Sequence, residues 1–190
     1  MKDADVRVAL HRWLLQQHAA ELDDTRVVDE LGIAGEVRVD TVVLNGSFAG
    51  FEIKSARDTL RRLPKQVEVY SAVLDYATLV VASNHIAHAR SLLPRWWGIV
   101  EARADGDEVK LVPRRKPRRN SRINAFMLCT LLWRAEALEE LDAVGAARGY
   151  RSKPNAVLWE RLATVHDPEA LRTIVRERLK VRPEWRAGAA

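Results

Sequence analysis

Hydrophobic, strand-forming residues crowd two neighbouring segments in the first third of the chain. The first segment covers residues 37–44, the second covers residues 49–54, and Asn45-Gly46 stands between them. Asn-Gly between two such runs is the strongest short hairpin signal, because both residues accept the positive φ angles of a tight turn. The two segments are therefore predicted to form an antiparallel hairpin.

The hydrophobic pattern on either side of this hairpin alternates between helices and strands. Helical spacing predicts helices over residues 5–20, 64–74 and 84–93. Further strands are expected over residues 76–83, 96–103 and 108–112. A strand, helix, strand order implies a right-handed crossover and a parallel pair of strands. The predicted fold class is α/β, with a mixed central sheet flanked by helices.

The pattern becomes wholly helical after residue 122, which predicts a C-terminal extension of three helices. These helices are expected over residues 123–144, 154–165 and 167–180. The chain is expected to divide into a core, a basic linker and a helical subdomain, over residues 1–113, 114–122 and 123–190. The extension could bind DNA or a protein partner, or could pack as a cap on the core. The sequence leaves both interpretations open, together with a possible homodimer.

Candidate chemistry lies on the central hairpin. Glu52 and Lys54 are two residues apart on one strand, so they share a face while Ile53 points to the other face. Asp40 lies on the neighbouring strand. Unpaired buried charge is costly, so two carboxylates and an ammonium on one sheet face indicate a bound divalent cation with a lysine beside it. Hard oxygen ligands of this kind suit Mg²⁺ or Mn²⁺.

Asp40 followed across a hairpin by Glu52-x-Lys54 resembles the PD-(D/E)XK nuclease superfamily. Gln66-x-x-x-Tyr70 on the next predicted helix resembles an extra motif of the RecB-type, Cas4-like branch of that superfamily. The resemblance covers roughly residues 5–100. The proline that gives the superfamily its name is absent before Asp40.

The resemblance also implies an acidic residue before the hairpin, and two glutamates are candidates for it. Residues 25–31 are predicted to form a short strand or a strand-to-helix junction that brings Glu30 towards the sheet. Glu36 lies in a turn flanked by glycine. We therefore prefer Glu30 and keep Glu36 as the alternative.

The resemblance implies a restriction-endonuclease-like fold and a metal-dependent deoxyribonuclease. Its implied catalytic residues are Glu30, Asp40, Glu52, Lys54, Gln66 and Tyr70. Asp40, Glu52, the backbone carbonyl of Ile53 and Glu30 would hold Mg²⁺ or Mn²⁺. Lys54 would orient the attacking water or stabilise developing charge, and Gln66 and Tyr70 would position Lys54 or the scissile phosphate.

Positive charge is concentrated in places that suit a polyanionic substrate. The formal net charge is +5, and residues 114–122 hold six basic residues and no acidic one, so the excess is local. This run is either a solvated linker or a phosphate-binding segment. A second basic group precedes the helix at residues 64–74. The expected nucleic-acid contacts are Arg57, Arg61, Arg62, Lys65, Arg114, Arg115, Lys116, Arg118 and Arg119.

Composition narrows the remaining choices. The 190 residues are 47% hydrophobic and 30% charged, which is typical of a globular protein. Cys129 is the single cysteine, which excludes an internal disulfide and a cysteine-rich zinc site. We expect a cytoplasmic location without a membrane partner, because neither a signal peptide nor a membrane-spanning apolar run is recognisable. The alternatives to a nuclease are a catalytically silent nucleic-acid-binding module and a structural or partner-binding protein. RNA as a substrate, strand preference, cleavage mode and pathway (DNA repair or phage defence) stay open.

Overall fold

A single six-stranded mixed sheet forms the centre of the protein, seen here in a computed structural model that describes residues 2–106 and 108–183. The strands are β1 Arg26–Ile33, β2 Val37–Leu44, β3 Phe48–Lys54, β4 Tyr76–Ala82, β5 Gly98–Asp105 and β6 Glu108–Arg115. They neighbour one another in chain order. The pairs β3–β4 and β4–β5 are parallel, and the other pairs are antiparallel. The predicted α/β class and the predicted central hairpin are confirmed.

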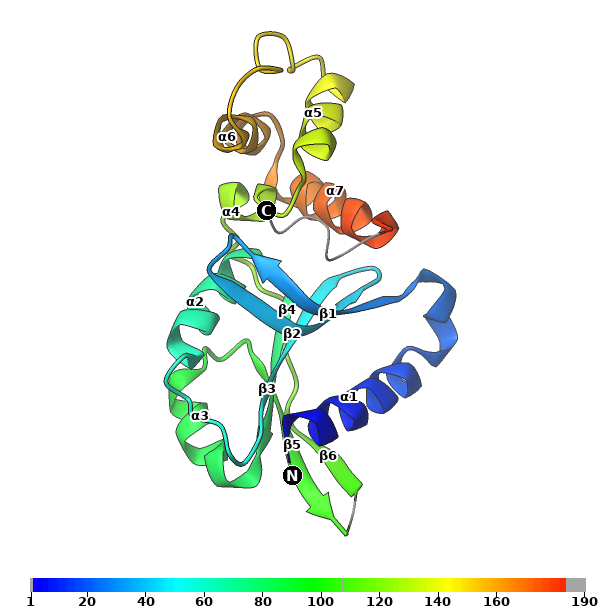
Figure 1. Cartoon of the computed structure of the whole chain (residues 1–190), viewed down its shortest axis with the longest axis vertical. Helices are drawn as coiled ribbons and strands as arrows, with labels where there is room; N and C mark the ends of the chain where they lie inside the picture. The colour runs from blue at the N-terminus through cyan, green and yellow to red at the C-terminus, as the bar shows by residue number, and fades with distance from the viewer. Residues whose placement is uncertain (1, 107, 184–190) are drawn as a thin grey trace.

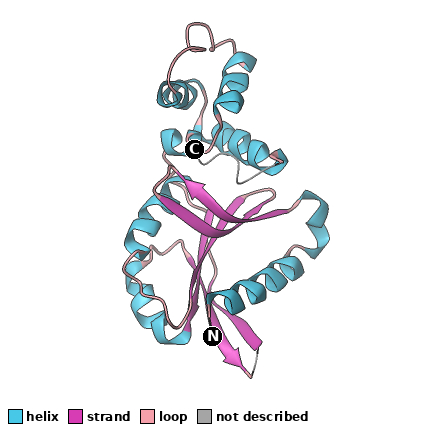
Figure 2. Ribbon diagram, in the orientation of Figure 1, coloured by secondary structure: helices cyan, strands magenta, loops and turns pink. Residues whose placement is uncertain are grey.

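Helices cover both faces of the sheet. The helix α1 (Asp3–Gln17) lies on one face, and α2 (Leu63–Val73) and α3 (Ile86–Leu92) lie on the other (Figure 1). Two short 3₁₀ segments, η1 (Ala19–Asp24) and η2 (Ser83–His85), connect helices to strands. The C-terminal helices gather beyond the β1–β2 end of the sheet (Figure 2). They are α4 Ala125–Cys129, α5 Arg134–Ala143, α6 Asn155–Val165 and α7 Pro168–Val181.

Each face of the sheet has its own hydrophobic core. On one face, Val6 and Leu10 of α1 belong to the same cluster as Phe51 and Ile53 of β3. The larger cluster on the other face includes residues of α2, α3 and all four helices of the described C-terminal part. The two faces of β3 are therefore packed differently, which fixes the direction in which Glu52 and Lys54 point.

The first predicted helix of the C-terminal extension is wrong in its length. Residues 123–144 form two helices, α4 and α5, instead of one. Asn124 caps α4 by accepting from the Met127 amide, and Trp133 is extended and donates its amide to the Glu136 carboxylate, which starts α5. Hydrophobic periodicity continues through this break, so it could not reveal two local hydrogen-bonding caps.

The predicted start of the basic linker lies inside a strand. β6 continues through Pro113 to Arg115, and an edge strand such as β6 is a place where a sheet tolerates proline. Beyond it, Asn120 is buried and donates to the carbonyls of Ser71 and Leu74. The segment is therefore packed against the core over part of its length. The predicted helix at residues 84–93 is likewise shorter, because η2 replaces its first turn. Residues 184–190 of the predicted C-terminal subdomain lie outside the described residues.

A buried ion pair joins the C-terminal helices to the start of β4. Arg172 of α7 bonds to the Asp75 carboxylate and donates to the Asn120 carbonyl at 2.8 Å. Asp75 also accepts from the Phe48 amide at 2.8 Å. Both charged side chains are 5% exposed, so removing one partner leaves the other charge buried and unpaired.

We expect Arg172→Met to lower the free energy of unfolding by about 3 kcal/mol, because a buried carboxylate loses its counter-ion. Arg176→Met is the control on the same helix. Arg176 pairs with Glu177 at 3.2 Å and donates to the Gly46 carbonyl at 3.3 Å, and Glu177 is 50% exposed, so its removal leaves no buried charge unpaired. The control should change stability by less than about 1 kcal/mol. Urea unfolding of both variants measures this, and equal effects would contradict the assigned role of the pair.

Candidate active site

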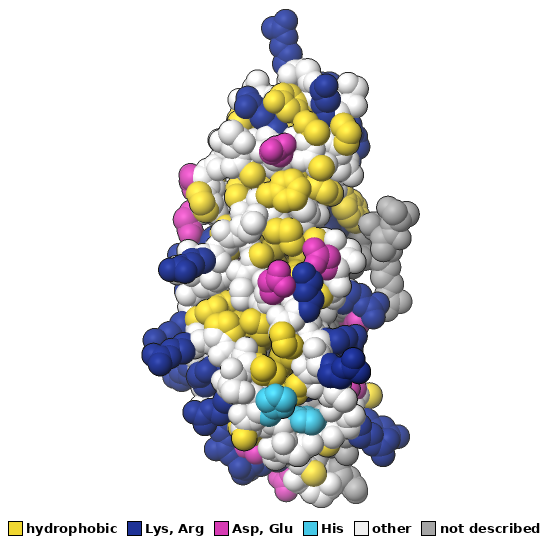
Figure 3. Space-filling view, turned by 90° about the vertical axis from the view of Figure 1, so that its left-hand side faces the viewer, with side chains coloured by type: hydrophobic (Ala, Val, Ile, Leu, Met, Phe, Trp, Pro, Cys, Tyr) yellow, Lys and Arg dark blue, Asp and Glu magenta, His cyan; other side chains and the backbone are white. Residues whose placement is uncertain are grey.

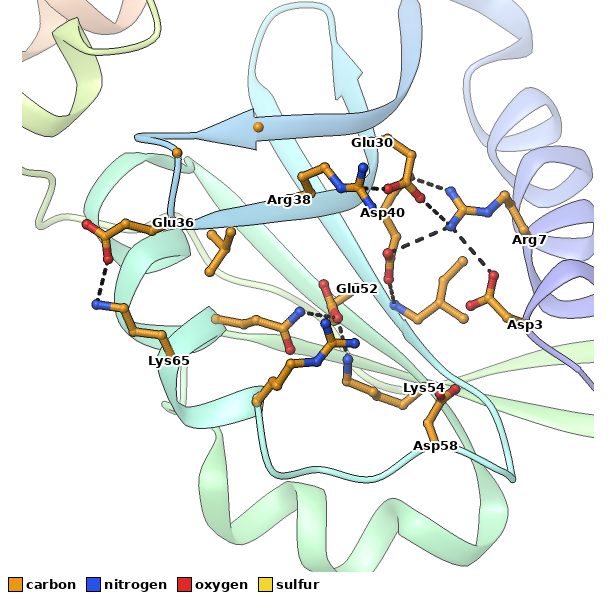
Figure 4. Close-up of a pocket in the computed structure, with 16 residues that line it drawn as sticks. Asp3, Arg7, Glu30, Glu36, Arg38, Asp40, Glu52, Lys54, Asp58 and Lys65 are labelled. Carbon is orange, nitrogen blue, oxygen red and sulfur yellow. Dashed lines mark hydrogen bonds and ion pairs between the residues drawn. The ribbon is translucent and has the colours of Figure 1, made fainter. Parts of the chain in front are cut away.

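A cavity of about 670 Å³ opens where the C-terminal end of β3 meets the N-terminal end of α2 (Figure 4). It is lined by Asp40 of β2, by Glu52, Ile53 and Lys54 of β3, and by Gln66 of α2. Glu30 and Glu36, the two candidates for the preceding acidic residue, line it as well. The structure thus brings most of the predicted catalytic residues to one cavity.

Glu52 is the most constrained of these side chains, and it is 1% exposed. Its Oε1 accepts from Lys54 Nζ and from Gln66 Nε2, each at 2.5 Å. Its Oε2 lies 2.5 Å from the Tyr70 hydroxyl. Gln66 and Tyr70 reach the same carboxylate because they are four residues apart on α2. Three donors hold this carboxylate in one orientation. Burial raises the pKa of the Tyr70 hydroxyl, and the negative charge of Glu52 raises it further.

Asp40 stands where β2 and β3 separate. The regular pairing of the two strands ends at Thr41 and Phe51, and the Asp40 carboxylate then accepts from the Ile53 amide at 2.7 Å. A side chain thus replaces the missing backbone acceptor at the place where the strands diverge. This contact leaves the second oxygen, Oδ1, facing Arg7 at 3.7 Å.

Burial and the negative charge of Glu52 make ionisation of the Asp40 carboxyl group unfavourable, which raises its pKa. Burial raises the pKa of Asp40 first and the neighbouring Glu52 charge raises it further, to about 7 from 3.8. The pKa of Asp40 is lowered by the Ile53 amide, Lys54 and Arg7, but these effects do not offset the increase. A carboxyl group whose pKa is raised by burial and by a neighbouring carboxylate is a feature of many functional sites, and a bound cation would favour its ionised form.

The preceding acidic residues are held by basic side chains. Glu30 has a left-handed backbone, with φ of 59°, and its carboxylate pairs with Arg7 at 2.9 Å and with Arg38 at 3.1 Å. Glu36 pairs with Lys65 at 2.7 Å. Glu30 lies near Asp40 in the same charged group, whereas Glu36 lies on the α2 side of the cavity (Figure 4). The assignment of Glu30 as a metal ligand stays a prediction.

Sequence reasoning missed the residue that links this group, Arg7 of α1. Its guanidinium donates to the Asp40 backbone carbonyl at 2.6 Å and to Glu30 at 2.9 Å. In the sequence Arg7 forms an ordinary i, i+4 pair with Asp3, which is typical of a solvent-exposed helix face. No local signal distinguishes it from such a pair.

Several oxygen atoms at the cavity are of the kind that a divalent cation prefers. Asp40 Oδ1 and Glu52 Oε2 have remaining lone pairs, and the Ile53 carbonyl belongs to the residue directly after Glu52. Gln66 Oε1 is buried and lacks a hydrogen-bond partner among the described residues. Residues 2–106 and 108–183 contain no group of three or more His, Cys, Asp or Glu that could hold a metal ion, so a cation here would have only two carboxylates and a backbone oxygen as protein ligands.

The predicted nucleic-acid contacts fall into two separate groups. Arg62 and Lys65 line the cavity, and Arg57 and Arg61 are exposed nearby on the segment between β3 and α2. The basic run lies at the opposite end of the parallel strands, because Asn120 bonds to the residues that precede β4. Its side chains are partly engaged within the protein, Arg115 with the Pro94 carbonyl and Arg119 with Glu169.

Arg114, the first residue of the run, also has a fixed partner. It bonds to Glu101, and hydrogen bonds from Arg103 and then Ser83 and Arg114 lower the pKa of Glu101 to about 2 despite its burial. Part of the positive charge at the start of the run is therefore neutralised locally. Lys116 and Arg118 are exposed.

Comparison with known proteins corrects the expected family. A family model described as bacteriophage P4 protein cII matches residues 1–185. The PD-(D/E)XK superfamily, suggested by six positions in order, is therefore the wrong family for this chain. The expectation that the chain is a metal-binding nuclease because of its family is therefore wrong. The chemistry that the residues themselves could perform is a separate question.

One curated relative is protein cII of Enterobacteria phage P4, which is 28% identical over 146 residues. The match covers 76% of this chain but 54% of the relative, so the chain spans about half of that protein's length. Among solved structures, a protein of unknown function from Silicibacter pomeroyi (SPO1766) matches with a TM-score of 0.41 at 20% identity, over 74% of this chain and 89% of that one. SfsA from Pyrococcus furiosus, in complex with Ca²⁺, matches with a TM-score of 0.37 at 15% identity, over 60% and 63%.

None of the helices in the described ranges combines the length and the apolar character that crossing a membrane requires. The expected cytoplasmic location stays a prediction.

Proposed function

The chain belongs to the bacteriophage P4 protein cII family, and we propose that it hydrolyses phosphodiester bonds in DNA with a divalent cation held by Asp40 and Glu52. The observation that carries the proposal is the pair of carboxylates at the cavity, Glu52 buried and Asp40 half-buried, with Lys54 Nζ 2.5 Å from Glu52 Oε1.

The protein side of the reaction follows from the contacts in the cavity. Asp40, Glu52 and the Ile53 carbonyl would hold Mg²⁺ or Mn²⁺, whereas the Glu30 carboxylate pairs with Arg7 and Arg38. When bound, the cation supplies Lewis-acid neutralisation of the phosphoryl oxygens and a water of lowered pKa. Lys54 donates hydrogen bonds at the cavity wall, where it can orient that water or stabilise charge that develops on the phosphate.

The remaining two predicted residues act behind this group. Gln66 and Tyr70 hold the Glu52 carboxylate in place through hydrogen bonds of 2.5 Å each. They are positioning residues rather than groups that contact the phosphate. The expectation from the sequence is that they position Lys54 or the scissile phosphate.

Basic side chains at the cavity support a polyanionic substrate. Arg62 and Lys65 lie at its edge, and Lys and Arg gather along both sides of the face that carries α2 and α3 (Figure 3). DNA is the proposed substrate, and RNA is included as a second substrate in the cleavage assay. A homodimer, or a protein partner for the C-terminal helices, stays a prediction.

The experiment that tests the proposal is cleavage of labelled single-stranded DNA, duplex DNA and RNA in Mg²⁺, Mn²⁺ or EDTA. The wild type is compared with Lys54→Ala and with Lys110→Ala, an exposed lysine on β6. We expect metal-dependent cleavage by the wild type and the control, and its loss in Lys54→Ala. Equal cleavage by all three proteins would place the activity elsewhere.

A second candidate, the catalytically silent nucleic-acid-binding module, is favoured by one observation. Arg7 already places a positive charge beside Asp40, so the site is partly neutralised without a metal. This candidate predicts DNA binding that weakens with salt, without cleavage by the wild type under any of the metal conditions.

We expect Arg62→Ala to weaken DNA binding and to lower the slope of log K against log salt by about one, because one phosphate contact is lost. Lys110→Ala, the matched control, removes an exposed charge from β6. It should leave the cleavage rate at saturating DNA unchanged. Fluorescence anisotropy over a salt series, with single-turnover cleavage, measures both effects, and an unchanged slope in Arg62→Ala would exclude Arg62 from the interface.

A further inference from the structure

Arg7 is a basic side chain of α1 that reaches into the candidate active site. Its side chain is 21% exposed, and it crosses from α1 to the strands β1 and β2 (Figure 4). Nη1 donates to the Asp40 carbonyl at 2.6 Å, and Nη2 lies 3.7 Å from Asp40 Oδ1. The guanidinium is therefore fixed against both the backbone and the carboxylate of Asp40.

The guanidinium lies among four carboxylates that come from three elements. The distances are 3.6 Å to Asp3, 3.5 Å to Asp29, 2.9 Å to Glu30 and 3.7 Å to Asp40. An exposed surface pair is held by one partner and contributes little. Arg7 instead lies close to four carboxylates beside the cavity, so its positive charge offsets part of their negative charge.

From this geometry we infer that Arg7 is a built-in counter-cation that competes with the divalent metal for Asp40. The inference rests on the proposed function, because it assumes that Asp40 is a metal ligand. Arg7 faces Oδ1, the Asp40 oxygen that does not accept from the Ile53 amide. A cation bound to that oxygen meets the positive charge of Arg7 at short range, and two positive charges at this range repel each other strongly.

Arg7 consequently has two opposite effects. Without metal it holds Glu30 and Asp40 in position and neutralises part of their charge. With metal it weakens binding, so the site requires a higher metal concentration than its carboxylates alone would need. Arg7 is a positioning residue in this account, and the tuned quantity is metal affinity.

The test is calorimetric titration of Mn²⁺ into the wild type, Arg7→Gln, Arg7→Lys and Asp40→Asn at low ionic strength. Arg12→Gln is the matched control: it removes the same charge from the same helix, but Arg12 is 60% exposed and pairs with Glu108 at 3.7 Å, away from the cavity. Thermal unfolding without metal confirms that each variant is folded. We expect Arg7→Gln to bind Mn²⁺ about tenfold more tightly than the wild type. Arg7→Lys and Arg12→Gln should stay close to the wild-type value.

The outcomes separate this inference from the proposed function. Equal affinity of Arg7→Gln and the wild type, or weaker binding by Arg7→Gln, would overturn the competition while leaving the metal site in place. If Asp40→Asn binds Mn²⁺ as tightly as the wild type, Asp40 is not a metal ligand. That result would overturn both this inference and the proposed function. Absence of Mn²⁺ binding in every protein would do the same.

Discussion

Asp40→Asn is expected to lower the rate of metal-dependent DNA cleavage by about 10³-fold, the loss that corresponds to several kcal/mol of transition-state charge stabilisation by a bound cation. The substitution is nearly isosteric, and the oxygen of the introduced side-chain amide can still accept from the Ile53 amide, as Asp40 does at 2.7 Å. The structure around the cavity should therefore persist while the charge that attracts the cation is gone. Single-turnover cleavage of end-labelled DNA in Mg²⁺ measures the effect.

The control for this variant is Asp23→Asn, which removes an exposed carboxylate from η1 outside the cavity. It should cleave at the wild-type rate. DNA affinity should be nearly the same for all three proteins, because the phosphate contacts lie on basic residues. Wild-type cleavage by Asp40→Asn would remove Asp40 from the mechanism.

The same substitution should raise stability at alkaline pH in the absence of metal. The pKa of Asp40 is raised to about 7 by burial and by Glu52, above its value in an unfolded chain. The folded state therefore binds the proton more tightly, and stability falls as the pH rises from about 4 to about 7. A shift of this size costs up to about 4 kcal/mol above pH 7. The Asp40→Asn variant has no ionisable group at this position, so its free energy of unfolding does not fall for this reason as the pH rises.

Urea unfolding in EDTA at pH 4.5, 6 and 8 tests this prediction. The stability difference between Asp40→Asn and the wild type should become steadily more favourable to the variant as the pH rises. Asp23→Asn should follow the wild-type pH profile, because Asp23 is exposed. A difference that is constant with pH would show that Asp40 ionises at its ordinary pKa, and the carboxylate repulsion would then be absent.

The parts of the site that the sequence predicted are those set by local geometry. Alternation along β3 places Glu52 and Lys54 on one face and Ile53 on the other, and the Asn45-Gly46 turn brings β2 beside them. Helical spacing brings Gln66 and Tyr70 to the same carboxylate. Each of these results depends on residues within a single element or on one tight turn.

The parts that could not be predicted depend on contacts between distant elements. Arg7 joins a helix to two strands, and its sequence neighbours suggest an ordinary exposed pair. The left-handed backbone of Glu30 allows an irregularity in β1 that hydrophobic pattern does not encode. The break between α4 and α5 arises from side-chain caps inside a continuous hydrophobic pattern.

The family was mistaken for a related reason. A motif of six residues describes one cavity, and similar carboxylate and lysine arrangements can occur in unrelated chains. The family match extends over residues 1–185 and so includes the C-terminal helices that the motif ignores. The local chemistry and the ancestry of the chain are therefore separate conclusions.

The most direct measurement of the central claim is anomalous diffraction from crystals soaked in Mn²⁺. The account predicts an anomalous peak in the cavity, in contact with Asp40 and Glu52, and the loss of that peak in Asp40→Asn crystals. A cavity without a peak, with Mn²⁺ bound only elsewhere on the protein, would contradict the claim that these two carboxylates hold a catalytic cation.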